Sequence, residues 1–168
     1  MEKLLSRGVL ALYVVILLWL VLFKLTFNLS AMLDHRHRSL NWMPFASNAG
    51  EMVLNCLFFI PFGLLLSVNF KRVGFLSKLA IIALFSLTAE LAQYIFAIGA
   101  TDITDLITNT FGGFLGLAVY SLGSHYSSAK TLDRIIVYAG AFVLVFAVAL
   151  HVSHFMRRFM PVFFLSTT

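Results

Sequence analysis

The sequence predicts an all-α membrane protein, a bundle of about five transmembrane helices. Of its 168 residues, 61% are hydrophobic and only 11% are charged, and the mean hydropathy is +0.96. Soluble domains contain roughly 25% charged residues. Long apolar runs alternate with short polar segments along the chain. This composition excludes an ordinary soluble domain, and we interpret residues 1–168 as a single membrane domain.

The charged residues do not indicate a nucleic-acid partner. The chain has 12 Lys and Arg against seven Asp and Glu, which gives a net charge of +5. The basic residues are scattered between the apolar runs, as charges that flank membrane spans are, and do not form one patch in the sequence. We therefore expect membrane lipids, and no nucleic acid, as the partner of these charges.

Cysteine and histidine give no reason to expect a cofactor or a metal ion. The single cysteine, Cys56, lies in an apolar run and excludes an internal disulfide. Five histidines are present, but no cysteine accompanies them at a metal-ligand spacing and no H-E-x-x-H motif occurs. We predict neither a cofactor nor a metal site.

Five apolar segments are predicted to cross the membrane. A helix rises 1.5 Å per residue, so about 20 residues span the ~30 Å hydrocarbon core. We interpret the first segment as a retained helix and not as a signal peptide, because it is long and no small-residue cleavage site follows it. The predicted spans are about 8–27, 52–70, 79–98, 103–122 and, as an additional C-terminal helix, 135–155.

Polar residues begin the second span and interrupt the third. Asn55 lies in the first turns of the second span, and Glu90 lies inside the otherwise apolar third span. Gln93 follows Glu90 by three residues and shares its helical face. An ionisable group within the membrane costs about 2.5–3.5 kcal/mol on insertion scales. Glu90 therefore indicates either a function or a hydrogen-bonding role between helices.

The fourth span begins with a polar face that continues into small residues. Asp102, Asp105 and Asn109 are spaced by three and four, and Gly112 and Gly116 continue the series. Asp102 suits a helix N-cap and Asp105 complements the helix dipole, but neither role explains Asn109, two turns further on. The two glycines form the small-residue pattern of closely packed membrane helices. They predict helix packing and offer a face for a homo-oligomer.

The short connections between spans predict the orientation of the chain. Residues 70–78 contain three basic residues and no acid, whereas residues 99–105 contain two acids and no base. Cytoplasmic loops are enriched in Lys and Arg. We therefore predict a multi-pass membrane protein with its N-terminus in the cytoplasm and its C-terminus outside.

In this orientation the polar residues meet at the outer ends of three helices. We expect them to line one cavity in the outer leaflet, with two arginines of the long connection at its lip. Guanidinium groups suit the recognition of phosphate or carboxylate, although solvated loop arginines are a simpler alternative. The predicted ligand-binding residues are Asn55, Glu90, Gln93, Asp102, Asp105, Asn109, Arg36 and Arg38.

Four spaced motifs lie between about residues 38 and 120. They are Asn41-Trp42-Met43-Pro44-Phe45, Asn55-Cys56-Leu57-Phe58-Phe59-Ile60-Pro61-Phe62-Gly63, Glu90-Leu91-Ala92-Gln93, and Asp102-Ile103-Thr104-Asp105 continuing through Asn109-Thr110-Phe111-Gly112-Gly113-Phe114-Leu115-Gly116. Together and in this order, they make the sequence resemble the VanZ-like family of bacterial membrane proteins. The resemblance implies a role in the cell envelope, typified by lowered susceptibility to the glycopeptide teicoplanin.

Three kinds of function are compatible with these residues. In the first, which we favour, the cavity binds a lipid-linked envelope component or an amphiphilic glycopeptide. In the second, the protein is a membrane enzyme in which Glu90 and Asp105 form an acid–base pair acting on a lipid-linked substrate. In the third, it is a structural or partner-binding membrane protein without a ligand site, and the acids only join helices.

Overall fold

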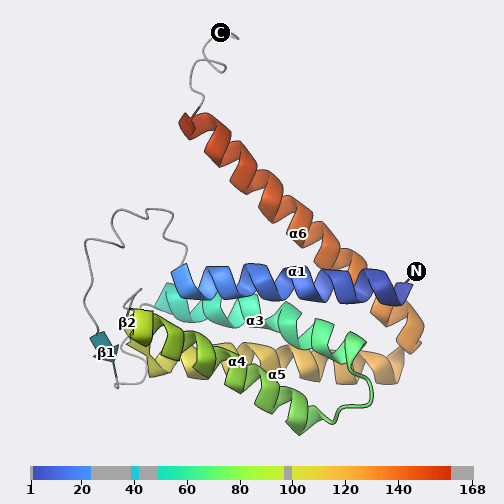
Figure 1. Ribbon diagram of the computed structural model, residues 1–168. Helices are drawn as coiled ribbons and strands as arrows, with labels where there is room; N and C mark the ends of the chain where they lie inside the picture. The colour runs from blue at the N-terminus through green and yellow to red at the C-terminus, as the bar shows by residue number, and fades with distance from the viewer. Residues whose placement is uncertain (1, 24–38, 42–48, 97–99, 160–168) are drawn as a thin grey trace, which may run out of the picture.

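The computed structural model describes residues 2–23, 39–41, 49–96 and 100–159. Figure 1 shows α1, α3, α4 and α5 running alongside one another in alternating directions, while α6 diverges from this bundle. The elements in these ranges are α1 (Glu2–Phe23), β1 (Ser39–Asn41), α3 (Ala49–Asn69), α4 (Phe75–Phe96), β2 (Ala100–Asp102), α5 (Ile103–Tyr126) and α6 (Ala129–Phe159).

The helices confirm the predicted all-α membrane fold. Within the described ranges, four helices are long and apolar enough to cross a membrane, namely Glu2–Leu22, Ala49–Asn69, Phe75–Phe96 and Ile103–Tyr126. The helices extend past the apolar runs, because backbone hydrogen bonding continues into the polar flanks. The fifth predicted span lies within α6, and its passage through a membrane stays a prediction.

Two short strands are a feature that the sequence analysis did not predict. β1 and β2 pair in parallel, with Ser39 beside Ala100 and Asn41 beside Asp102. Each strand has three residues, which is too short to show the alternation that identifies strands in a sequence. The pairing holds the backbone of the connection after α1 against the start of α5.

α3 and α5 approach each other until their backbones touch. A Cβ atom added at Gly112 or Gly116 would overlap the backbone carbonyl oxygen of Cys56 or Ile60, and Gly63 on α3 faces the α5 backbone in the same way. The small-residue pattern therefore packs α5 against α3 of the same chain. A homo-oligomer that used Gly112 and Gly116 would have to displace α3.

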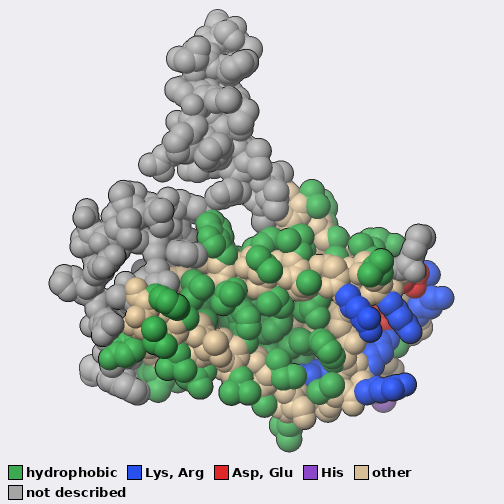
Figure 2. Space-filling model, in the orientation of Figure 1, with side chains coloured by type: hydrophobic (Ala, Val, Ile, Leu, Met, Phe, Trp, Pro, Cys, Tyr) green, Lys and Arg blue, Asp and Glu red, His purple; other side chains and the backbone are tan. Residues whose placement is uncertain are grey.

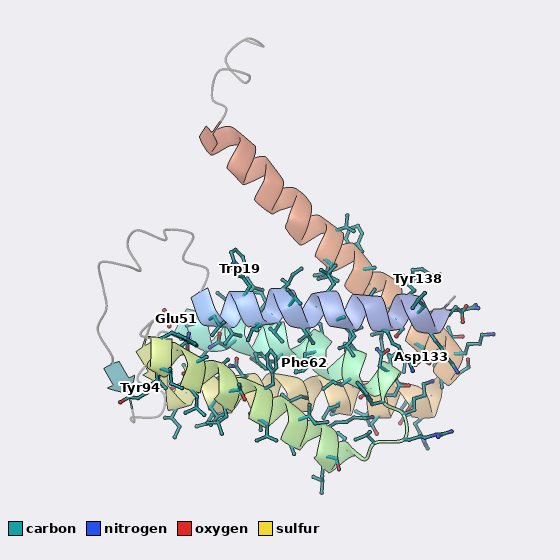
Figure 3. The ribbon with its side chains drawn as sticks, viewed as in Figure 1. Trp19, Glu51, Phe62, Tyr94, Asp133 and Tyr138 are labelled. Atoms are coloured by element: carbon teal, nitrogen blue, oxygen red, sulfur yellow. The ribbon has the colours of Figure 1, made fainter. Side chains whose placement is uncertain are left out.

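An apolar centre separates the two ends of the bundle. The rings of Phe59 and Phe62 on α3 lie 6.0 Å apart between centroids, and the Phe62 ring lies 5.1 Å from that of Phe85 on α4. Phe62 lies midway along the bundle in Figure 3. Ring pairs of this kind contribute about 0.5–1.5 kcal/mol beyond their buried area. Among the described residues, the Tyr13 hydroxyl is a polar group of this centre, and it donates to the Phe58 carbonyl over 2.7 Å, whereas the carboxyl groups and the Lys and Arg side chains lie towards the two ends.

Candidate functional site

Seven polar side chains meet at the end of the bundle where α4 ends and where α3 and α5 begin. Six of them are at most 6% exposed, and Asn55 is partly buried. Figure 3 shows Tyr94 at this end of the molecule and Asp133 at the opposite end. We call this set the polar cluster; it comprises Asn55, Ser86, Glu90, Gln93, Asp102, Asp105 and Asn109.

Glu90 connects the end of α4 to the start of α5. Its Oε2 atom accepts a hydrogen bond of 3.0 Å from the backbone N–H of Asp102. The hydroxyl of Thr101 donates to the backbone carbonyl of Glu90 over 3.2 Å. Glu90 is only 3% exposed, so this carboxyl group faces the protein and not the lipid. Its position fits both the functional and the interhelical interpretation of an intramembrane glutamate.

Asp102 has the local role that its position in the sequence suggests. It is the N-cap of α5, with an extended backbone (φ −127°, ψ 124°), and its Oδ1 accepts from the backbone N–H of Thr104 over 2.8 Å. This bond satisfies one of the N–H groups that a helix start leaves without a partner. β2 leads directly into this cap, so strand pairing and capping together determine where α5 begins.

Asp105 makes a contact that the local sequence does not reveal. The Nδ2 atom of Asn55 on α3 donates to Asp105 Oδ1 over 2.8 Å. Asp105 is 2% exposed, and an intramolecular hydrogen bond contributes about 0.5–1.5 kcal/mol net. The pair therefore joins α3 to α5 just beyond the glycine contact.

Asn109 uses its amide nitrogen for a neighbour on α4. Its Nδ2 atom donates to the hydroxyl of Ser86 over 3.0 Å, and both side chains are fully buried. Ser86 precedes Glu90 by four residues and thus lies on the same helical face, a spacing that could have identified it as a cluster member. The Oδ1 atom of Asn109 accepts no hydrogen bond from the described residues. Asn109 therefore offers a buried acceptor.

Gln93 is directed to the end of α1. Its Nε2 atom donates to the carbonyl oxygens of Val21 at 2.9 Å and Leu22 at 3.3 Å. The last carbonyl groups of a helix have no hydrogen-bond partner within the helix, and a bilayer supplies no water to replace one. Gln93 therefore provides the missing donor for the carbonyl groups at the end of α1. The Oε1 atom of Gln93, like Asn109 Oδ1, has no hydrogen-bond partner in the described part of the chain.

The structure brings together the six predicted site residues that it describes, but in a closed arrangement. Their side chains bond to one another, to Ser86 and to backbone groups. The low exposure of the cluster differs from the open cavity that we expected from the sequence. The remaining two, Arg36 and Arg38, lie outside the described residues. A cavity of about 600 Å³ lies at the other end of the bundle.

Chemically, the polar cluster is rich in hydrogen-bond acceptors. It contains three carboxyl groups and three amides, and none of the hydrogen bonds described above comes from Lys or Arg. A group with several N–H or O–H donors, such as a sugar or a peptide, is the complement of such a set. The carboxyl groups and amide oxygens can therefore recognise donors, provided that the closed arrangement opens.

Comparison with known proteins assigns the chain to a family. The family model described as VanZ/LLP1 matches residues 10–124, a range that contains the whole polar cluster and begins in the first helix. The chain is also 56% identical over 147 residues to "Protein VanZ" from Enterococcus faecium, an alignment that covers 86% of this chain and 91% of that protein. No solved structure matches the chain. The chain therefore belongs to the VanZ/LLP1 family of membrane proteins.

Proposed function

We propose that this protein lowers the susceptibility of a bacterial cell to glycopeptides of the teicoplanin type. Membership of the VanZ/LLP1 family and 56% identity to "Protein VanZ" support this role in the cell envelope. The protein acts in the plasma membrane, with the polar cluster towards the outer surface and the N-terminus in the cytoplasm. The four lysines and arginines of the α1 start and the 70–73 turn support this orientation, since cytoplasmic segments are enriched in these residues.

The polar cluster holds the polar part of a lipid-linked envelope component or of an amphiphilic glycopeptide. The observation that carries this proposal is the presence of buried acceptors without partners: Gln93 Oε1 and Asn109 Oδ1 receive no hydrogen bond from the described residues. An amide oxygen buried in this way costs about 1–3 kcal/mol. A sugar hydroxyl or a peptide N–H that reached these atoms would recover that free energy.

The outer face of the helices around the cluster suits the apolar part of the same ligand. Several large hydrophobic side chains on α3, α4 and α5 are exposed beside the cluster, and in a bilayer they contact acyl or prenyl chains. Ligand entry requires the cluster to open, with the Asn55–Asp105 and Ser86–Asn109 hydrogen bonds exchanged for bonds to the ligand. The exposed side chains that define this apolar surface are Leu54, Leu57, Leu87, Leu91, Ile107 and Phe111.

Glycopeptide susceptibility of cells that produce Glu90→Gln or Asp105→Asn at the wild-type protein level tests this function. Each substitution keeps the shape of the side chain and replaces its carboxyl group by an amide, which accepts fewer hydrogen bonds, so we expect protection to fall to that of cells without the protein. Glu51→Gln is the matched control, because Glu51 is an exposed carboxylate near the same end of α3 (Figure 3). Unchanged protection by both cluster variants would refute a functional site here.

A second measurement separates binding from chemistry. The purified protein is incubated with candidate lipid-linked headgroups and with teicoplanin, and the products are weighed by mass spectrometry. An intact mass with retained ligand supports binding, whereas a changed mass means that a reaction has taken place, for which Glu90 and Asp105 are the candidate acid–base pair.

A purely structural role is the second candidate, and the internal hydrogen bonds of the cluster favour it. Glu90 and Gln93 join α4 to α5 and α1, respectively. Under this interpretation Glu90→Gln leaves protection unchanged, since the amide oxygen still accepts from the Asp102 N–H. The Glu90→Gln variant therefore distinguishes the two candidates, whereas a variant that disrupts α3–α5 packing abolishes function under both.

A further inference from the structure

The end of the bundle opposite the polar cluster contains a pocket that the proposed function does not use. Its volume is about 600 Å³, and its walls come from the start of α1, the end of α3 with the turn that follows, and the start of α6. The turn is compact, because the Val73 N–H donates to the Phe70 carbonyl over 3.1 Å. Figure 2 shows Lys and Arg side chains gathered at this end of the molecule, and few elsewhere on the visible face.

The pocket carries a surplus of positive charge. Six basic side chains and two acidic ones line it. Both acids are already engaged: Glu2 accepts from Arg134 over 2.6 Å, and Asp133 contacts Lys71 and accepts from the Tyr120 hydroxyl. The four remaining basic side chains make no ion pair with any described residue and are exposed; they are Lys3, Arg7, Arg72 and Lys130.

The pocket has one polar wall and one apolar wall. The Ser6 hydroxyl donates to Asn69 Oδ1 over 3.0 Å, and Asn69 Nδ2 donates to the Leu65 carbonyl over 2.9 Å. Ser6 and Asn69 thus form a defined hydrogen-bonded wall beneath the cations. Val68 and Val137 add a buried apolar wall. A ligand for such a pocket is anionic at one end and apolar at the other.

The position of the pocket identifies the source of such a ligand. It lies where α1 begins and α3 ends, which is the level at which the membrane-spanning helices leave the hydrocarbon core. Phospholipid phosphates occupy the same level, and basic pockets between transmembrane helices on the cytoplasmic side bind anionic headgroups. A soluble phosphate would satisfy the cations but would not use the apolar wall.

We propose that this basic pocket binds the phosphate headgroup of an anionic phospholipid in the leaflet nearest the N-terminus. Arg7 and Arg72 hold the phosphate from two sides, and Lys3 and Lys130 add attraction at the rim. The apolar wall receives the first methylenes of the acyl chains. This site is independent of the polar cluster, because the apolar centre of the bundle lies between them.

Native mass spectrometry of the delipidated full-length protein in detergent tests this site, with phosphatidylglycerol as the probe and phosphatidylcholine as the neutral comparison. We expect selective retention of phosphatidylglycerol by the wild type. The double variant Arg7→Gln/Arg72→Gln should bind it roughly thirtyfold more weakly, since each basic residue near a lipid surface contributes about 1 kcal/mol. Arg157→Gln/Arg158→Gln is the control, because it removes the same charge in the last turn of α6, whereas the pocket is lined by the first turns of that helix.

Three outcomes would overturn this proposal. Equal retention by the wild type and the pocket variant would mean that the pocket holds no headgroup. If the pocket variant and the control lost equal amounts of phosphatidylglycerol, the lipid would be attracted by the net charge of the protein alone. Displacement of phosphatidylglycerol by millimolar inorganic phosphate would identify a site for the free anion. The melting temperature of each variant, followed by circular dichroism, identifies misfolding, in which case Lys130→Gln, on α6 at the exposed rim, replaces the double variant.

Discussion

The two ends of the bundle handle polar groups in opposite ways. At the end with the polar cluster, carboxyl groups and amides are buried or partly buried and bond to one another, as the partly buried Asn55 and the buried Asp105 do over 2.8 Å. At the end with the basic pocket, charged side chains are exposed; Arg134 and Glu2 bond over 2.6 Å with side-chain exposures of 51% and 59%. The shorter contact is thus the one that water reaches.

From this difference we expect burial, more than distance, to decide how much each of these polar contacts contributes to stability. A buried hydrogen bond has no water to replace a lost partner, so its loss leaves the other group unsatisfied. An exposed ion pair gains little, because water solvates both charges as well as they solvate each other. The internal hydrogen bonds of the polar cluster are therefore expected to persist until a ligand replaces them, whereas the charges of the basic pocket are available to a ligand without such an exchange.

The largest loss of stability is expected when the close packing of α3 against α5 is disrupted. Gly112→Leu places a side chain against the backbone carbonyl of Cys56, and a backbone cannot move aside as a flexible side chain can. We expect a destabilisation of about 3 kcal/mol or more, at the upper end for overpacking. Thermal unfolding in detergent measures it, with Gly8→Leu as the control, since nothing lies within 4 Å of a Cβ at Gly8. Equal melting temperatures would contradict the close α3–α5 packing.

An intermediate effect is expected from the buried pair at the polar cluster. Asn55→Ala and Asp105→Ala each remove one partner, and the double variant removes both. A double-mutant cycle of unfolding free energies should give a coupling of about 0.5–3 kcal/mol, the range for two side chains in direct contact. Additive changes in the unfolding free energy would show that the two side chains do not interact, and the hydrogen bond between them would then not stabilise this end of the bundle.

The smallest effect is expected from the exposed pair at the basic pocket. Arg134→Gln removes the contact with Glu2, yet both side chains are more than half exposed. We expect the melting temperature of the Arg134→Gln variant to stay within experimental error of the wild type. A clearly lower melting temperature would mean that the exposed ion pair also stabilises the fold, and the two ends of the bundle would then not differ in this respect.

The sequence alone predicts the parts of this protein that depend on local geometry. Apolar composition and the 3.6-residue period predict membrane-spanning helices with Glu90 and Gln93 on one face and Asp102, Asp105 and Asn109 on another. The N-cap at Asp102 is also readable, because a cap involves residues two or three positions apart. The family motifs lead to the same residues, all within the matched range.

The tertiary structure alone decides which groups become partners across helices. Asp105 meets Asn55, Asn109 meets Ser86, and Gln93 reaches the end of α1. The glycine face is likewise occupied by α3 of the same chain. Spacing along one helix determines which residues share a face, but the rotation and crossing of the helices determine what that face contacts, and both depend on the packing of all the helices at once. For this reason a polar face could be predicted as a site, and its closure could not.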